Sequence, residues 1–102
     1  MADIEVVDNP REHRYEARMG GELAGFAAYE LTSGVITFTH TEVDDAFEGK
    51  GVGSVLVRGA LDAVRAGGVR KVRPLCPFVK AYIGRHPDYQ DLLQSAADED
   101  AR

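Results

Sequence analysis

The segment from Val35 to Val64 changes its hydrophobic period partway along, and this change limits the fold more than any other feature of the chain. Residues 35–43 are rich in β-branched side chains, which favour a strand. Alternate glycines then stand at positions 49, 51 and 53, and apolar residues recur at helical spacing from Val52 to Val64. The segment therefore predicts a strand, a glycine loop and a helix in direct succession.

A glycine loop between a strand and a helix predicts a site for an anion. Glycine lets the backbone come close to a ligand, and the first helical turn offers free N–H groups and the positive end of the helix dipole. The loop is not a dinucleotide-binding fingerprint, because Ser54 stands where the third glycine is required. It is not a P-loop, because Gly51 follows Lys50 in place of serine or threonine. We therefore expect a phosphate or pyrophosphate site of another kind.

The remaining elements predict an α+β fold. Before the glycine loop, the alternation of side chains predicts an antiparallel meander of strands over residues 4–7, 14–19, 23–31 and 35–43. After the first helix, residues 69–75 predict a strand parallel to the last strand of the meander, since a helix crossover joins the two. A C-terminal helix is expected to begin at Pro77 and to end at His86.

Composition and charge argue against several classes of protein. A chain of 102 residues with 44% hydrophobic and 28% charged residues predicts one globular domain, over residues 1–94, followed by a flexible polar tail at 95–102. The net charge of −5 argues against nucleic-acid binding, and no apolar run has the length of a membrane span. Cys76 has no partner for an internal disulfide and the N-terminus lacks a signal-peptide pattern, so we expect a cytoplasmic protein.

Further short motifs extend the pattern over most of the chain. They are His40-Thr41-x-Val43, Gly49-Lys50-Gly51-Val52-Gly53, Pro74-Leu75-Cys76-Pro77-Phe78-Val79 and Tyr82-x-x-x-His86-Pro87. Between Tyr15 and about Leu93, the chain resembles the short single-domain proteins of the GNAT acetyltransferase superfamily. The resemblance implies a minimal GNAT-like fold, in which a meander is followed by a parallel β-α-β unit and a last helix.

The resemblance also implies that the glycine loop binds the pyrophosphate of acetyl-CoA. The superfamily pattern is Gln/Arg-x-x-Gly-x-Gly/Ala, and this chain departs from it with Glu48 in the first position. The pantetheine arm is then expected in a gap between residues 35–43 and 69–75, where the two strands separate. The residues expected to bind the cofactor are Thr41, Val43, Glu48, Gly49, Lys50, Gly51, Val52, Gly53, Ser54 and Phe78.

Cys76 is the first candidate for catalysis. It follows a predicted strand and precedes a predicted helix, and a helix N-terminus stabilises a thiolate. The resemblance implies a catalytic role near the thioester. The alternative is a small, inert cysteine buried in the core.

His40 and Tyr82 are the other catalytic candidates. His40 lies in the strand that would flank the acetyl group, where a neutral imidazole accepts a proton from an amine or, alternatively, makes a structural contact. The resemblance implies that Tyr82 protonates the leaving thiolate, and packing of its ring into the core is the alternative. The histidines and the cysteine lack the spacing of metal ligands, so no metal site is expected.

Together these residues predict an acetyl-CoA-dependent N-acetyltransferase whose acceptor is an unidentified amine of a small molecule or a protein. Transfer is either direct or through an acyl-enzyme at Cys76. Only the stretch from Glu5 to Tyr15 separates the first two predicted strands, so the helical pair on the acceptor side of the wider superfamily is absent. For this reason, a module that binds CoA or acetyl-CoA with little or no catalysis is the alternative.

Overall fold

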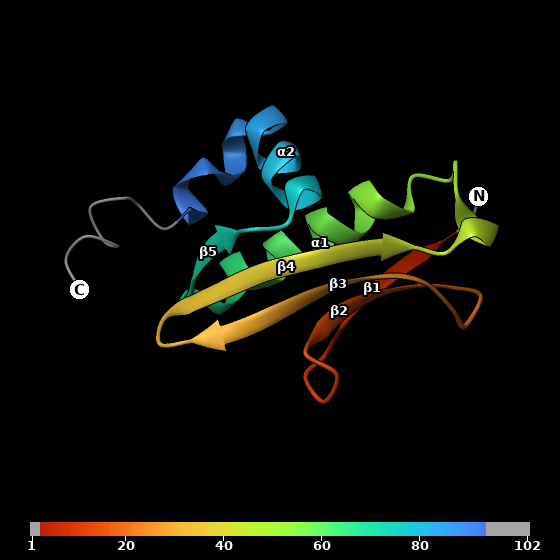
Figure 1. The fold of residues 1–102 in the computed structure, drawn as a ribbon, viewed down its shortest axis with the longest axis horizontal. Coiled ribbons are helices and arrows are strands. Elements are labelled where there is room, and N and C mark those ends of the chain that lie inside the picture. Colours follow the sequence, from red (N-terminus) through yellow and green to blue (C-terminus); the bar gives the residue numbers. More distant parts are fainter. Residues whose placement is uncertain (1–2, 94–102) are drawn as a thin grey trace.

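The computed structural model describes residues 3–93. They form a single mixed sheet and helices that pack against it (Figure 1). The strands lie side by side in chain order. The first four form an antiparallel meander, and the fifth pairs with the fourth in parallel. Their bounds are β1 Ile4–Asn9, β2 Arg14–Met19, β3 Glu22–Thr32, β4 Val35–Val43 and β5 Lys71–Pro74. The predicted fold class is therefore confirmed.

Two α-helices cover the inner face of the sheet. Helix α1 (Val52–Gly67) crosses from β4 to β5, and α2 (Pro77–Arg85) follows β5. Both helices are amphipathic. Their apolar side chains pack against the inward side chains of the strands in one core, and their polar sides face solvent. The largest fully buried apolar side chains are Phe38, Leu56, Leu61 and Ile83.

The termini of the elements differ in detail from the sequence prediction. β5 begins at Lys71, not at residue 69, because β4 begins only at Val35 and offers no earlier partner. β5 also ends before Leu75, whose N–H turns back to the carbonyl of Arg73. Two 3-10 helices, η1 (Asp45–Phe47) and η2 (Pro87–Leu92), flank the regular elements, and η1 was not predicted from the sequence.

β4 and β5 form a fork that positions the candidate site. Their parallel pairing runs from Val35 with Lys71 to Phe38 with Pro74. Just beyond this pairing, the N–H of Cys76 donates to the carbonyl of Phe38 at 2.9 Å. β4 continues to Val43 without a β5 partner, so the two chains separate beyond this point.

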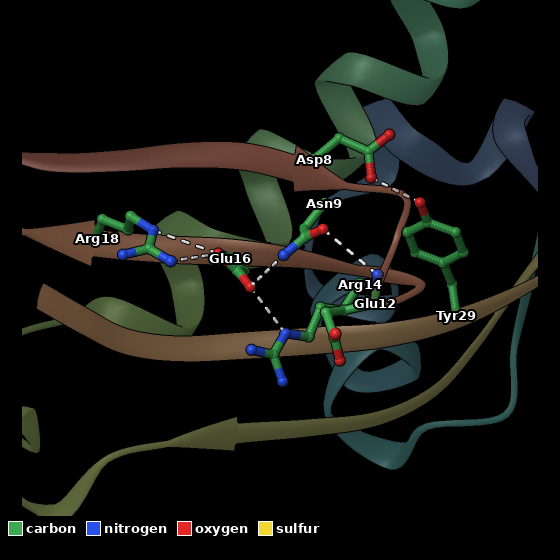
Figure 2. A network of polar contacts seen from close by, with 7 residues as sticks. All are labelled: Asp8, Asn9, Glu12, Arg14, Glu16, Arg18 and Tyr29. Carbon is green, nitrogen blue, oxygen red and sulfur yellow. Dashed lines mark hydrogen bonds and ion pairs between the residues drawn. The ribbon is translucent and has the colours of Figure 1, made fainter. Parts of the chain in front are cut away.

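The outer face of the sheet carries a buried charge. The side chain of Glu16 is only 3% exposed, although it points away from the helices. It accepts hydrogen bonds from Asn9 Nδ2 at 2.9 Å, from Arg14 Nε at 2.9 Å, and from Arg18 Nη2 at 2.8 Å (Figure 2). The two guanidinium groups cover the carboxylate, so it is both paired and shielded from water.

We predict that Glu16 makes folding stability depend on pH. Its pKa is lowered to about 2, chiefly by the hydrogen bond from Asn9 and further by Arg18 and Arg14, against the opposing effect of burial. A lowered pKa means that the stabilisation is complete above the unfolded value of 4.5 and is lost as the pH falls toward 2. The wild type should therefore exceed Glu16→Gln in free energy of unfolding by about 3 kcal/mol at neutral pH.

Urea denaturation of both proteins at pH 7 and at about pH 3 measures this difference. The gap between the two proteins should shrink at the acidic value, since Gln does not titrate. A gap of the same size at both pH values would mean that Glu16 contributes through packing and not through its charge.

Two further expectations bear on the termini and on membranes. The tail expected at residues 95–102 lies outside the described residues, as do residues 1, 2 and 94 of the domain predicted over 1–94. Among the helices of residues 3–93, none combines the length and apolar character needed to cross a bilayer.

Candidate functional site

A hollow of about 380 Å³ opens at the start of α1, between the end of β4 and the start of α2. Its lining includes every residue predicted for cofactor binding except Thr41 and Lys50. Phe47 is an additional lining residue that the sequence analysis did not select. The structure therefore brings the predicted loop residues and Phe78 together at one site.

The glycines of the loop have distinct physical roles at this hollow. Gly51 caps α1 with a φ of 76°, in the left-handed region that favours glycine. A Cβ on Gly53 would lie 2.7 Å from the end of the Phe78 ring, which faces the first turn of α1. Glycine at these positions thus keeps the loop unstrained and leaves the ring in place.

The first turn of α1 has the properties of an anion site. The first hydrogen bond of the helix runs from Val55 N–H to Gly51 carbonyl at 3.1 Å, which leaves the preceding amide groups without helical acceptors. No acidic side chain lies in this turn, and no side chain caps it. Glu48 places a carboxylate at the rim, so backbone dipoles, not side-chain charges, provide the attraction here.

Cys76 lies at the fork. It is two residues before Phe78, which lines the hollow, but Cys76 itself is not a lining residue. It is 3% exposed and is the N-cap of α2. Its Sγ is 3.2 Å from Thr41 Oγ1, and either atom can be the donor. The pair joins the start of α2 to the part of β4 that pairs with β3 but not with β5. Thr41 and Cys76 therefore mark the inner side of the fork.

His40 lies on the opposite face of the sheet from this pair. Neighbouring side chains of a strand alternate between faces, so His40 points outward while Thr41 points inward. The imidazole is 59% exposed, and its Nε2 is 3.0 Å from Glu42 Oε2. Its ring also meets the edge of Phe26, with 6.2 Å between ring centres. The structure therefore does not join His40 and Cys76 in one cluster.

Glu42 is a functional candidate that the sequence analysis missed. It stands two residues after His40 on the same strand, which places both side chains on one face. A carboxylate on one imidazole nitrogen orients the ring and leaves the other nitrogen available. The spacing of the two residues was visible in the sequence once their strand was predicted.

Tyr82 lines a second, smaller hollow of about 200 Å³ between α1 and α2. Its ring is 4% exposed and stacks on His86 with 4.0 Å between ring centres. His86 Nδ1 donates to the carbonyl oxygen of Tyr82 at 2.8 Å, which holds the pair in place. Ser54 lines both hollows, so the second is adjacent to the first along α1. Lys50 is exposed and lines neither hollow.

The part of the chain that the structure describes holds no group of metal-ligating side chains. Its single cysteine is a free thiol. The described residues place a helix terminus with free amide groups beside a thiol–hydroxyl pair, with a histidine–carboxylate pair on the other side of the same strand.

Solved structures support this description of the fold. The NMR solution structure of a GCN5-like protein from Staphylococcus aureus superposes with a TM-score of 0.67. The alignment covers 93% of this chain and 92% of that one, and 23% of the aligned residues are identical. This level of identity supports a shared fold. Among curated protein sequences, none is significantly similar to this chain.

The sequence itself matches a family model over most of the described residues. The model is that of the GCN5-related N-acetyl-transferases, and the match covers residues 14–92. This span includes the glycine loop, the fork and all of α2, which are the features that form the candidate site. The chain therefore belongs to the GCN5-related N-acetyltransferase family.

Proposed function

We propose that this protein is an acetyl-CoA-dependent N-acetyltransferase that acts on an amine. The observation that carries the proposal is the position of the α1 N-terminus. Its free amide groups face a hollow that lies directly beside the fork of β4 and β5. An anion site and a gap between strands are thus adjacent, as a long cofactor with a pyrophosphate and a thioester arm requires.

The residues of the hollow suit such a cofactor. Amide groups at the start of α1 would hold the pyrophosphate, and Phe78 and Val43 would contact the apolar part of the arm. Acetyl-CoA supplies an acetyl group activated as a thioester. The separated part of β4 offers backbone N–H groups toward the fork, where they would polarise a carbonyl oxygen.

His40 is the residue we propose as general base. The attacking amine must be uncharged, and a neutral imidazole held by Glu42 through Nε2 leaves Nδ1 to accept the amine proton. The amine nitrogen then forms a bond to the acetyl carbon as the carbon–sulfur bond breaks. The sulfur leaves as a thiolate and takes up one proton, for which Tyr82 remains our predicted donor.

We propose direct transfer and not an acyl-enzyme at Cys76. Within the described residues, the hydrogen-bonding partner of its side chain is the Thr41 hydroxyl, and no histidine lies beside the sulfur to accept its proton. A nucleophilic thiol needs such a base or another source of thiolate. Cys76 is then a residue that lines the fork.

The variant Cys76→Ala tests the route. Direct transfer predicts that turnover stays within about tenfold of wild type, whereas loss of a nucleophile would remove several orders of magnitude. Mass spectrometry of the intact protein after exposure to acetyl-CoA should show no added acetyl group at Cys76. An acetylated wild type together with an inactive Cys76→Ala variant would establish the covalent route instead.

A CoA-binding module without efficient catalysis is the second candidate. It is favoured by the outer face of the sheet, which no helix of residues 3–93 covers, so that the acceptor side lacks an enclosing wall. Thiol release from acetyl-CoA, measured with and without a panel of amines, separates the candidates. Release that depends on an amine establishes the transferase, and tight CoA binding without release establishes the module.

A further inference from the structure

We propose that the outer face of the sheet binds an amine that also carries a carboxylate, and that Arg14 binds this carboxylate. The inference rests on the proposed function, because it names the class of the acceptor. It is carried by three side chains that lie in one row across three strands. Arg14 of β2 pairs with Ala28 of β3, and Ala28 pairs with His40 of β4.

The row leaves room for a small molecule. Paired residues of neighbouring strands point to the same face, so all three side chains point outward. Two strand spacings place the Cα atoms of Arg14 and His40 about 10 Å apart. The methyl group of Ala28 lies between their Cα atoms and fills little of that space. The Phe26 ring contacts both head groups, 4.7 Å from Arg14 Cζ and 6.2 Å from the centre of the His40 ring, so it forms one wall of the proposed site. The site then has a guanidinium at one end and an imidazole at the other.

Arg14 is held in an orientation that suits anion binding. Its Nε donates to Glu16 Oε2 at 2.9 Å, and its Cζ lies 4.7 Å from the centre of the Phe26 ring. These contacts fix the plane of the guanidinium. Figure 2 draws one bond from Arg14 to Glu16, through Nε, and within the described residues the two terminal nitrogens of Arg14 have no hydrogen-bond acceptor. An arginine with its terminal N–H groups unbound offers the planar fork that matches a carboxylate.

The order of charges along the row matches a zwitterion. The Arg14 end is positive, and the His40 end carries the carboxylate of Glu42. Beside that end, a hollow of about 90 Å³ is lined in part by Phe26, Glu42 and Asp44. A carboxylate is therefore attracted toward β2 and an ammonium group toward β4, where the proposed base would remove its proton.

The ammonium end of the row is also the end next to the fork. His40 stands two residues after Phe38, which is the last residue of β4 that pairs with β5. The edge of β4 at His40 has no β5 partner, so a group bound at His40 is close to the gap between β4 and β5. The row thus directs an amine toward the thioester, while its carboxylate stays on β2.

Arg18 provides a matched control for Arg14. It also donates to Glu16, through Nε at 3.2 Å and Nη2 at 2.8 Å. Its partner on β3 is Leu23, so it is not in the row of Ala28 and His40. The substitutions Arg14→Gln and Arg18→Gln each remove one positive charge and one guanidinium bonded to Glu16. Only the first removes the proposed carboxylate ligand.

Binding of acetylated products tests the inference without any need for turnover. NMR titration should compare N-acetyl-β-alanine with its neutral amide, N-acetyl-β-alaninamide. We expect the wild type and Arg18→Gln to bind the carboxylate form at least about tenfold more tightly, and Arg14→Gln to show no preference. The amide signals that shift should include those of Arg14, Ala28 and His40. Equal affinity of the wild type for both compounds would overturn the inference, as would loss of the preference in both variants alike.

Kinetics separate this inference from the proposed function. With β-alanine and β-alaninamide as acceptors, Arg14→Gln should raise the KM of β-alanine by at least about tenfold and leave that of acetyl-CoA unchanged. Thiol release that is equally efficient with the neutral amine would support the transferase and overturn the carboxylate site. Carboxylate binding that depends on Arg14, without thiol release, would support the site and count against the transferase.

Discussion

Replacement of Gly51 and Gly53 by valine is expected to weaken CoA binding by at least about 100-fold while the chain stays folded. The reason lies at the first turn of α1, where Gly51 and Gly53 line the hollow and have no side chains to fill it. A side chain on Gly53 would press on the Phe78 ring, which lies 2.7 Å from the position of its Cβ. Valine at Gly51 would be strained at a φ of 76° and would add a side chain to the loop that lines the hollow. Isothermal titration calorimetry with CoA measures the loss.

A second double variant controls for the strain of these substitutions. Gly34 has a φ of 73°, close to the 76° of Gly51, and a Cβ there would meet nothing within 4 Å. Gly84 lies in α2, as Gly53 lies in α1, but a Cβ on Gly84 would meet nothing within 4 Å. Gly34→Val with Gly84→Val should therefore reproduce the backbone cost of the two substitutions, without the clash at Phe78, and leave CoA affinity intact. If the loop variant is folded and binds CoA as the wild type does, the pyrophosphate site lies elsewhere.

Substitution of His40 by glutamine is expected to lower the turnover of an amine about 100-fold or more at neutral pH. Gln keeps the size and a polar contact with Glu42 but does not accept the amine proton. The Kd of acetyl-CoA should not change, because the imidazole lies on the outer face of the sheet and is not part of the hollow at α1. Steady-state kinetics and calorimetry together separate the two effects.

The pH profile gives this prediction a second readout. In His40→Gln the rate should rise as the pH approaches the pKa of the amine, because more of the acceptor is then uncharged without a base. Glu42→Gln should show a smaller loss than His40→Gln, since it removes the orienting group and keeps the imidazole. Wild-type rates in His40→Gln at neutral pH would remove His40 from the mechanism.

Much of the fold was predictable because its signals are local. The strand period of residues 35–43 and the helical period after Val52 follow from which side chains must be buried, and both elements appear where predicted. Pro77 marked the start of α2, because its missing N–H and its fixed φ suit the first helical position. The family motifs of the glycine loop and α2 likewise depend on local sequence, and the predicted family is confirmed.

The surroundings of the candidate side chains were less predictable, because they depend on strand pairing. The sequence placed His40 and Cys76 as candidates for one site, but it did not say that a strand's alternation would set them on opposite faces. Arg14 was not a candidate from the sequence, because an isolated arginine in a predicted strand is common and does not by itself indicate a site. Its row with Ala28 and His40 arises only from the register of three strands.

The sequence by itself determined the order of elements, the glycine-lined helix start and the family, since each depends on residues that are neighbours along the chain. Tertiary structure alone decided that Glu16 is buried on the outer face, that Thr41 meets Cys76, and where β4 leaves β5. These outcomes depend on the pairing register, and a shift of one residue would turn each strand side chain to the other face. Which groups meet at the fork is therefore a property of the whole sheet.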